Sequence, residues 1–214
     1  MSSMGQLPAQ SAEQAAWQPR SKLGLLVAQG KITSLAEVFA YGYRIQEPEV
    51  VKALLPDVES EVVGVRVVQK QTDAGELTRF SVVVAVGDRK EWFGVAHAKA
   101  PQIRLAIEKA TNEALLNIIP VHVGCGSWEC RCGQPHSLPL RTEGKAGSVR
   151  VILLPAPRGL GLVAGELLKQ LLRLAGIKDV WSKTFGDTST IISTAFAFYD
   201  ALVNLHDFVG ARRG

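Results

Sequence analysis

Cysteine is scarce in this 214-residue sequence, and long apolar runs are absent. The three cysteines all lie between Cys125 and Cys132, so they cannot form the disulfide framework of a secreted protein. No apolar run reaches the roughly 18 residues of a membrane helix, and the first residues lack the basic and apolar parts of a signal peptide. We therefore expect a cytoplasmic protein with no membrane segment.

The sequence also lacks a large excess of either charge. Its 24 basic and 20 acidic residues give a net charge of +4, so the surface favours anionic partners without being a polycation. Hydrophobic residues make up 47% of the chain, which is enough to bury one or two ordinary cores and excludes general disorder.

The first half of the chain has the pattern of a helix, three strands and a second helix. Ser34 and Glu37 have the spacing of a capping box at the start of the first helix. Two valine-rich runs, EVVGVRVVQK and TRFSVVVAVG, predict an antiparallel hairpin with QTDAGEL as its loop, and a third strand is predicted from Glu91 to Ala96. Residues 101–118 then show the apolar spacing of an amphipathic helix.

The second half predicts a glycine-rich crossing segment, a strand at 149–154, a helix at 160–175, a strand at 177–185 and a last helix at 190–205. We expect an N-terminal extension over 1–33, with about twenty mobile residues at its start, and a short basic tail over 207–214. Two α+β domains, 34–120 and 121–206, lie between them.

The stretch PAPRGLGLVAGELLKQ follows a predicted strand and contains a weak dinucleotide-binding signal. Gly159, Gly161 and Ala164 satisfy G-x-G-x-x-A, and Asp179 lies about 20 residues further on. However, too little chain follows for the remaining strands of a dinucleotide-binding fold, and two prolines place the glycines beyond the strand. The alternatives are a closely packed strand-to-helix turn, or a turn whose backbone approaches another anion.

The helix, three-strand, helix order is also that of the double-stranded RNA-binding domain, which sets a hairpin and a helix N-terminus against phosphates. Gly94 would let the backbone come close, and three candidate phosphate ligands lie on or beside the start of the following helix: His97, Lys99 and Arg104. Three cations flank the hairpin and could extend the same surface: Arg66, Lys70 and Arg79. The alternative is a half-buried histidine with solvated cations.

The segment CGSWECRCGQPHS offers four soft metal ligands within twelve residues, enough for tetrahedral zinc: Cys125, Cys130, Cys132 and His136. The Cys-x-Cys pair needs a sharp turn, which Gly133 could supply. Free thiols in a glycine-rich turn are the alternative. A catalytic cysteine has little support, because neither an oxyanion-hole motif nor a third orienting group is visible.

Several long stretches together resemble the archaeal form of the universal small-subunit ribosomal protein S-five family. They are RFSVVVAVGDRKEWFGVAHAKA, GCGSWECRCGQPHS, STAFAFYDALVNL and the region from GSVRVILLPAPRGLGLVAG to KTFGDTST. The likeness runs in order from about Trp17 to Leu205.

The resemblance implies an α+β fold, with a double-stranded-RNA-binding-like domain (α-β-β-β-α) followed by a β-β-β-α-β-α domain. It implies a structural rRNA-binding protein, not an enzyme, near the channel through which messenger RNA enters. The resemblance also implies that small-subunit proteins three, four and eight are neighbours and that the protein influences decoding accuracy. A nucleotide-binding oxidoreductase, or a free-standing RNA-binding or zinc module, remains the alternative.

By position, the resemblance also assigns RNA contacts. These are the hairpin residues Arg66, Lys70 and Arg79; the segment of Gly94, His97, Lys99 and Arg104; the turn of Arg158, Gly159 and Gly161; and Lys183 with Thr184. Two positions depart from the family pattern: His97 stands where glycine is expected, and PVHVGCG lacks the usual arginines. Fewer phosphate contacts should make rRNA binding less dependent on salt.

Overall fold

The computed structural model describes residues 17–130 and 132–211, and the chain divides into two compact units after Pro56. Residues 1–16 of the expected mobile tail and 212–214 of the expected basic tail lie outside the described residues. In the first unit, the described part contains three short helices: α1 (Lys22–Ala28), α2 (Leu35–Ala40) and α3 (Pro48–Leu54). The Ser34 side chain caps α2 by accepting from the Ala36 N–H group, as the capping spacing predicts.

The second unit begins with an antiparallel sheet in the order β1-β2-β3-β4. Its strands are β1 (Glu59–Thr72), β2 (Gly75–Gly87), β3 (Trp92–Ala100) and β4 (Ile119–Pro120). The hairpin is longer than the sequence pattern suggested, because pairing continues to Thr72 and Gly75 and leaves only two residues in the turn. Gly75 has φ +116°, a conformation open to glycine, and so closes this tight turn.

Helix α4 (Ile103–Leu116) packs on one face of this sheet through small residues. A Cβ atom on Gly94 would lie 2.4 Å from the Ala114 carbonyl oxygen, so glycine is required for the helix to approach the strand. The interpretation of Gly94 as a point of close backbone approach to a ligand was therefore wrong, because the approaching group is α4 itself.

The second sheet has the order β5-β6-β8-β7. Its strands and helices follow the expected β-β-β-α-β-α order: β5 (Thr142–Ala146), β6 (Val149–Pro155), β7 (Leu162–Val163), α5 (Glu166–Leu174), β8 (Val180–Phe185) and α6 (Ile191–Ala211). The prediction of a helix from Leu160 was wrong at its start, since Leu162 and Val163 pair with β8 and α5 begins only after Gly165. Helix α6 also continues through the first part of the expected basic tail.

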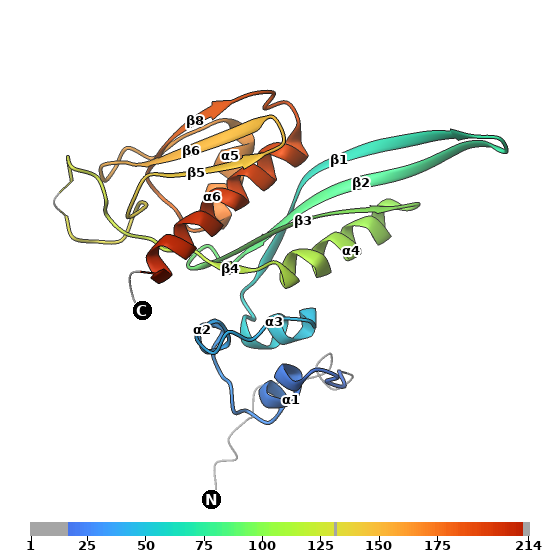
Figure 1. The fold of residues 1–214 in the computed structure, drawn as a ribbon, viewed down its shortest axis with the longest axis horizontal. Coiled ribbons are helices and arrows are strands. Elements are labelled where there is room, and N and C mark those ends of the chain that lie inside the picture. Colours follow the sequence, from blue (N-terminus) through green and yellow to red (C-terminus); the bar gives the residue numbers. More distant parts are fainter. Residues whose placement is uncertain (1–16, 131, 212–214) are drawn as a thin grey trace, which may run out of the picture. The chain divides into compact units, whose positions relative to one another are not determined.

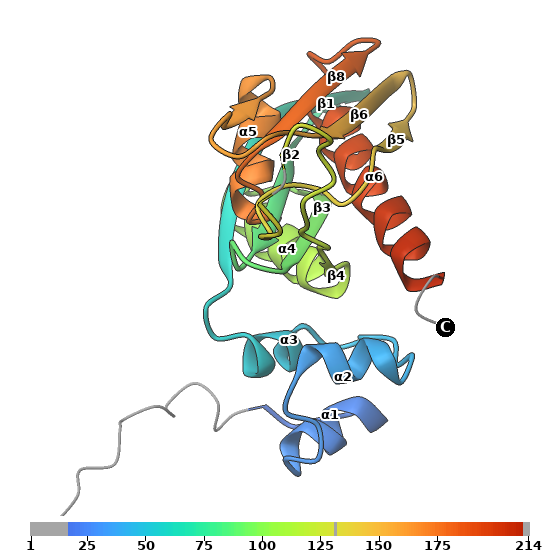
Figure 2. The same cartoon turned by 90° about the vertical axis from the view of Figure 1, so that its left-hand side faces the viewer.

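Helices α5 and α6 lie between the two sheets and share one hydrophobic core with both (Figures 1 and 2). The rings of Phe93 on β3 and Phe198 on α6 meet edge to face with centroids 5.3 Å apart. On the other side of α6, a Cβ atom on Gly144 of β5 would lie 2.2 Å from the Ala197 carbonyl oxygen. Because both sheets share this core, the chain from Asp57 onward forms one compact unit, whereas the sequence suggested a division near Pro120.

Candidate nucleic-acid interface

The β1–β3 sheet has one face covered by α4, and its opposite face carries most of the cations that were predicted from the sequence to contact RNA in this part of the chain. Ser81 pairs with Arg66 on β1 and with Lys99 on β3, so these three side chains form one row across the sheet. Paired residues project to the same face, and residues two positions apart along a strand do so as well. Arg66 and Lys99 are exposed, whereas Ser81 is buried.

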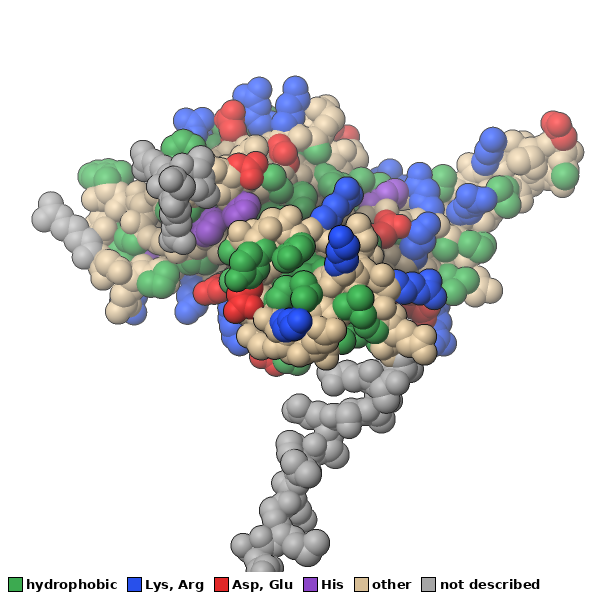
Figure 3. Space-filling view, turned by 60° about the horizontal axis from the view of Figure 1, so that its bottom comes forward, with side chains coloured by type: hydrophobic (Ala, Val, Ile, Leu, Met, Phe, Trp, Pro, Cys, Tyr) green, Lys and Arg blue, Asp and Glu red, His purple; other side chains and the backbone are tan. Residues whose placement is uncertain are grey.

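The same face continues along the hairpin towards its tip. Lys70 pairs with Leu77 and Arg79 pairs with Val68, and both registers place these cations on the face of the Arg66 row. Figure 3 shows Lys and Arg side chains spaced along the hairpin arm and acidic groups at its end. We call Arg66, Lys70, Arg79, His97 and Lys99 the hairpin face.

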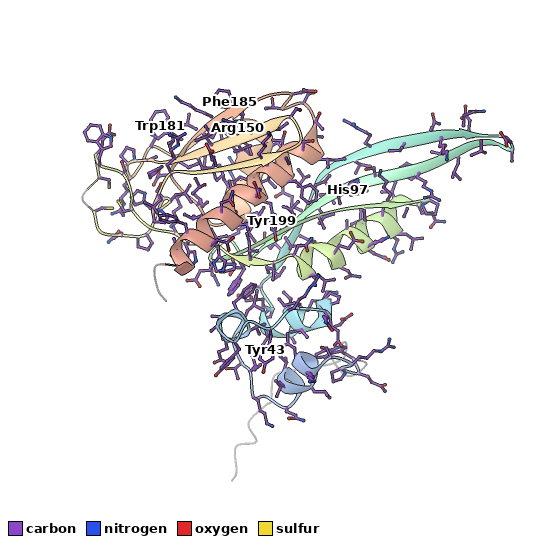
Figure 4. The ribbon with its side chains drawn as sticks, viewed as in Figure 1. Tyr43, His97, Arg150, Trp181, Phe185 and Tyr199 are labelled. Atoms are coloured by element: carbon purple, nitrogen blue, oxygen red, sulfur yellow. The ribbon has the colours of Figure 1, made fainter. Side chains whose placement is uncertain are left out.

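His97 is the partly buried member of the hairpin face (Figure 4). Its Nε2 atom lies 2.7 Å from the Ser81 Oγ atom. Burial, followed by the charge of Lys99, lowers the pKa of His97 below its ordinary value of 6.5. Burial and Lys99 thus disfavour the charged form of His97, and its ring contributes a hydrogen-bonding group beside Lys99.

The structure does not gather His97, Lys99 and Arg104 at the start of α4. His97 and Lys99 lie within β3, which runs to Ala100 and is longer than the sequence suggested. Arg104 lies on α4, where its Nε atom is 3.1 Å from the Glu108 Oε1 atom. Arg104 is thus separate from the hairpin face, because the strand and the helix present their cations to different sides of the sheet.

The glycine turn of residues 157–161 approaches an anion, and that anion belongs to the chain itself. Asp179 Oδ1 accepts hydrogen bonds from the N–H groups of Gly159 at 3.1 Å and Gly161 at 2.8 Å. Both glycines have positive φ, +87° and +78°. The helix predicted from residue 160 would have put these amides at its N-terminus, but α5 begins at Glu166 and the two N–H groups already bind Asp179.

The dinucleotide-binding alternative fails on the same observation. Asp179, the acid that the motif would place on a ribose, instead holds the glycine turn from inside the protein. Strands β5, β6 and β8 are antiparallel, and only the two-residue β7 runs parallel to its neighbour. A dinucleotide fold needs successive parallel strands joined by crossover helices.

The remaining predicted contacts lie on the second sheet and the glycine turn. Arg158 is exposed on the turn. Lys183 lies on the outer face of β8, between two exposed aromatic side chains, Trp181 and Phe185, while Thr184 points to the opposite face. Arg150, paired with Phe185, completes this outer group (Figure 4). Arg150 and the two aromatics were not predicted from the sequence, although the alternation in VWSKTF could have revealed Trp181 and Phe185.

The four candidate metal ligands come together. The Sγ atoms of Cys125, Cys130 and Cys132 and a ring nitrogen of His136 all lie within 4.8 Å of one another. A hydrogen bond from the Arg158 backbone N–H, with others from Cys132, lowers the pKa of Cys130 to about 6, whereas desolvation raises that of Cys125 to about 11. The thiols of Cys125 and Cys130 are therefore chemically unequal.

Together, the fold and the hairpin face define a class: a two-sheet α+β protein that presents a basic strand surface suited to a phosphate backbone. The chain matches the family described as "Ribosomal protein S5, N-terminal domain" over residues 58–122 and "Ribosomal protein S5, C-terminal domain" over residues 144–211. It belongs to the ribosomal protein S5 family, and the resemblance noted in the sequence is confirmed.

Archaeal relatives agree with this assignment over most of their length. The chain is 55% identical to the small ribosomal subunit protein uS5 of Thermofilum pendens over 192 residues, which cover 90% of this chain and 95% of that protein. It is 56% identical to the uS5 protein of Hyperthermus butylicus, over 90% of this chain and 91% of the relative. These relatives bear the name of a ribosomal protein and not of an enzyme. Among the described residues, no helix is long and apolar enough to cross a membrane.

Proposed function

We propose that this chain is a structural component of the cytoplasmic small ribosomal subunit and binds small-subunit rRNA through the hairpin face. The observation that carries the proposal is the row of Arg66, Ser81 and Lys99 across three strands. Arg66 and Lys99 are exposed in register on either side of the buried Ser81, and two such cations suit the oxygens of a phosphate backbone. The names of the relatives agree with this role.

The shape of the hairpin supports contact with folded RNA. Beyond the pairing of Phe80 with Ala100, β1 and β2 continue as a two-stranded ribbon with no third strand beside them. Lys70 and Arg79 lie on this ribbon. A ribbon of this kind can follow a groove or cross between RNA strands while its backbone stays fully paired.

The second domain supplies a separate candidate surface for RNA or for neighbouring ribosomal proteins. Its exposed cations include Arg158 on the glycine turn, with Lys183 and Arg150 on the outer face of the second sheet, while Thr184 lies on the opposite face of β8. The N–H groups of Gly159 and Gly161 position Arg158 through Asp179 rather than binding phosphate.

The finer placement follows from family membership. We propose that the protein lies near the channel through which messenger RNA enters, beside small-subunit proteins three, four and eight, and that it supports subunit assembly and decoding accuracy. Sucrose-gradient sedimentation of a native lysate tests the basic assignment. The chain should move with the small subunit and stay there after a high-salt wash, whereas a chain that stays at the top of the gradient would overturn the proposal.

A pair of matched variants tests the hairpin face. Arg66→Gln combined with Lys70→Gln removes two charges from the face, and Gln69→Glu with Gln71→Glu lowers the net charge equally on the opposite face of the same strand. Binding to small-subunit rRNA should weaken in the first variant, and the slope of log K against log salt should fall by about 1.5 for two lost phosphate contacts. The second variant should change both much less. If both variants weaken rRNA binding equally, only the net charge of the protein determines the affinity, and the hairpin face is not the rRNA-binding surface.

A further inference from the structure

The group of Cys125, Cys130, Cys132 and His136 lies in residues 123–143, between the two family matches. One potential ligand atom from each of the three cysteines and the histidine lies within 4.8 Å of the other three. The Cys125 and Cys132 Sγ atoms are 3.6 Å apart, and the Cys130 Sγ atom is 3.6 Å from the His136 Nε2 atom. Tetrahedral zinc, with bonds of about 2.3 Å to sulfur and 2.0–2.1 Å to nitrogen, places its ligand atoms about 3.5–3.8 Å apart.

The backbone holds the first and last ligands together independently of any ion. Gly124 and Ser137 form an isolated β-bridge, and the N–H groups of His136 and Ser137 both donate to the Gly124 carbonyl oxygen. A Cβ atom on Gly126 would lie 2.1 Å from the Pro139 carbonyl oxygen, so the segment needs glycine to pack this closely. Cys125 and His136 therefore face one another because both ends of the loop are fixed.

The residue that directly follows the Cys-x-Cys pair has a backbone conformation that favours glycine. Gly133, directly after Cys132, has φ +64°, a left-handed conformation that glycine adopts without strain. Cys132 itself lies against Cys125, because its thiol is in hydrogen-bonding contact with the Cys125 sulfur.

His136 is oriented as metal-binding histidines usually are. Its Nδ1 atom lies 2.9 Å from the Asp179 Oδ2 atom, and both side chains are buried. A carboxylate at Nδ1 holds the proton there, so Nε2 presents its lone pair to the three sulfurs. Two further hydrogen bonds, from the N–H groups of Lys178 and Asp179 to the His136 carbonyl oxygen, fix the residue from behind.

We propose that Cys125, Cys130, Cys132 and His136 bind one structural zinc ion, and that Asp179 joins this site to the glycine turn. The carboxylate of Asp179 is shared: Oδ2 meets the histidine ring, and Oδ1 accepts from Gly159 and Gly161. The ion thereby sets the position of the loop at 124–139 and, through one carboxylate, of the exposed Arg158. The ligand set is closed, with four protein donors, so the site is structural.

Elemental analysis of the purified full-length chain tests the site without any variant. We expect about one equivalent of zinc per chain after native purification, and cobalt exchanged into the site should show the visible d–d bands of a tetrahedral thiolate complex. Less than about half an equivalent of zinc, iron in its place, or a disulfide between two of the cysteines would overturn the proposal. None of these results depends on whether the chain binds rRNA.

Two substitutions test the roles of individual residues. His136→Asn should abolish stoichiometric zinc, while His206→Asn, which changes a histidine outside the group, should retain it. Asp179→Asn should keep zinc but weaken its affinity about 10–100-fold, measured by competition with a chelator, as is usual for partners of metal-binding histidines. Asp187→Asn, a change in an exposed turn after β8, is its control. Unchanged affinity in Asp179→Asn would remove Asp179 from the site.

Discussion

The Ser81 Oγ atom lies 2.7 Å from the His97 Nε2 atom, on the sheet face that carries Arg66 and Lys99. Ser81 is only 3% exposed, so its hydroxyl depends on this partner. Ser81→Ala should lower the free energy of unfolding by about 1–2 kcal/mol, because a partly buried imidazole loses its hydrogen bond. Urea unfolding measures the change.

Ser60→Ala is the control for this prediction, since Ser60 is exposed on the same sheet. Its effect should stay within about 0.5 kcal/mol. If the two variants lose equal stability, the hydrogen bond to His97 contributes nothing measurable.

Gly94→Ala distinguishes packing from ligand binding. Because the new Cβ atom would lie 2.4 Å from the Ala114 carbonyl oxygen, the variant should lose about 1–3 kcal/mol of stability. RNA affinity per folded molecule should remain unchanged. A stable variant with weakened RNA binding would instead restore the ligand-contact interpretation. Gly165→Ala, where no atom lies within 4 Å of the added Cβ, should cost less than about 1 kcal/mol.

Glu47 organises the N-terminal helical unit and makes it sensitive to acid. Its carboxylate accepts hydrogen bonds from the Trp17 ring and from the backbone N–H groups of Arg20 and Ser21. Burial alone would raise the pKa of Glu47, but these hydrogen bonds outweigh it and hold the pKa below its ordinary value of 4.5. The stabilisation that the Glu47 carboxylate gives to this unit is therefore complete above about pH 4.5. It is lost as the pH falls through the lowered pKa that Glu47 has in the folded protein.

Glu47→Gln should reproduce this acid effect at neutral pH. Amide hydrogen exchange in α1 should become about tenfold faster, which corresponds to the loss of about 1.4 kcal/mol from a charge-assisted hydrogen-bond group. The variant should also lose the wild-type dependence on pH below 4.5. Glu49→Gln, a change in the first turn of α3, is the control.

The edge-to-face contact of Phe93 and Phe198 predicts that both sheets unfold together. Each Phe→Ala variant should lose about 3–5 kcal/mol, and a double-mutant cycle should give a coupling of about 0.5–1.5 kcal/mol. Thermal unfolding followed by probes in each sheet should give a single transition for residues 57–211. Two separate transitions would show that the sheets do not share a cooperative core.

The hairpin, β3, α4, β6, β8 and α6 were predictable from the sequence, because alternating valines and helical apolar spacing are local signals. Helix α1 was not predicted, and β5 and β7 were expected only from the family resemblance. The start of α5 was not predictable, since Leu160 to Val163 fits helical spacing equally well and only pairing with Val180 and Trp181 makes β7 a strand. Tertiary pairing therefore outweighed local pattern at this point.

The candidate site was predictable in composition but not in geometry. The hairpin cations and the Cys/His group were visible as residues, whereas their common face depends on the register of Arg66 with Ser81 and Lys99. Asp179 was noticed only as part of a nucleotide motif. Its actual partner, His136, is 43 residues away, and no local pattern connects residues at that separation.

Strand β1 is the edge of its sheet, and Val65 and Val67 on it are exposed. A long edge with exposed valines is a template on which a second copy could add a strand and start aggregation. Arg66 and Lys70, placed among these valines, oppose such self-association by charge repulsion. We therefore expect the cations proposed to hold rRNA also to limit pairing between chains whose β1 edge is not covered.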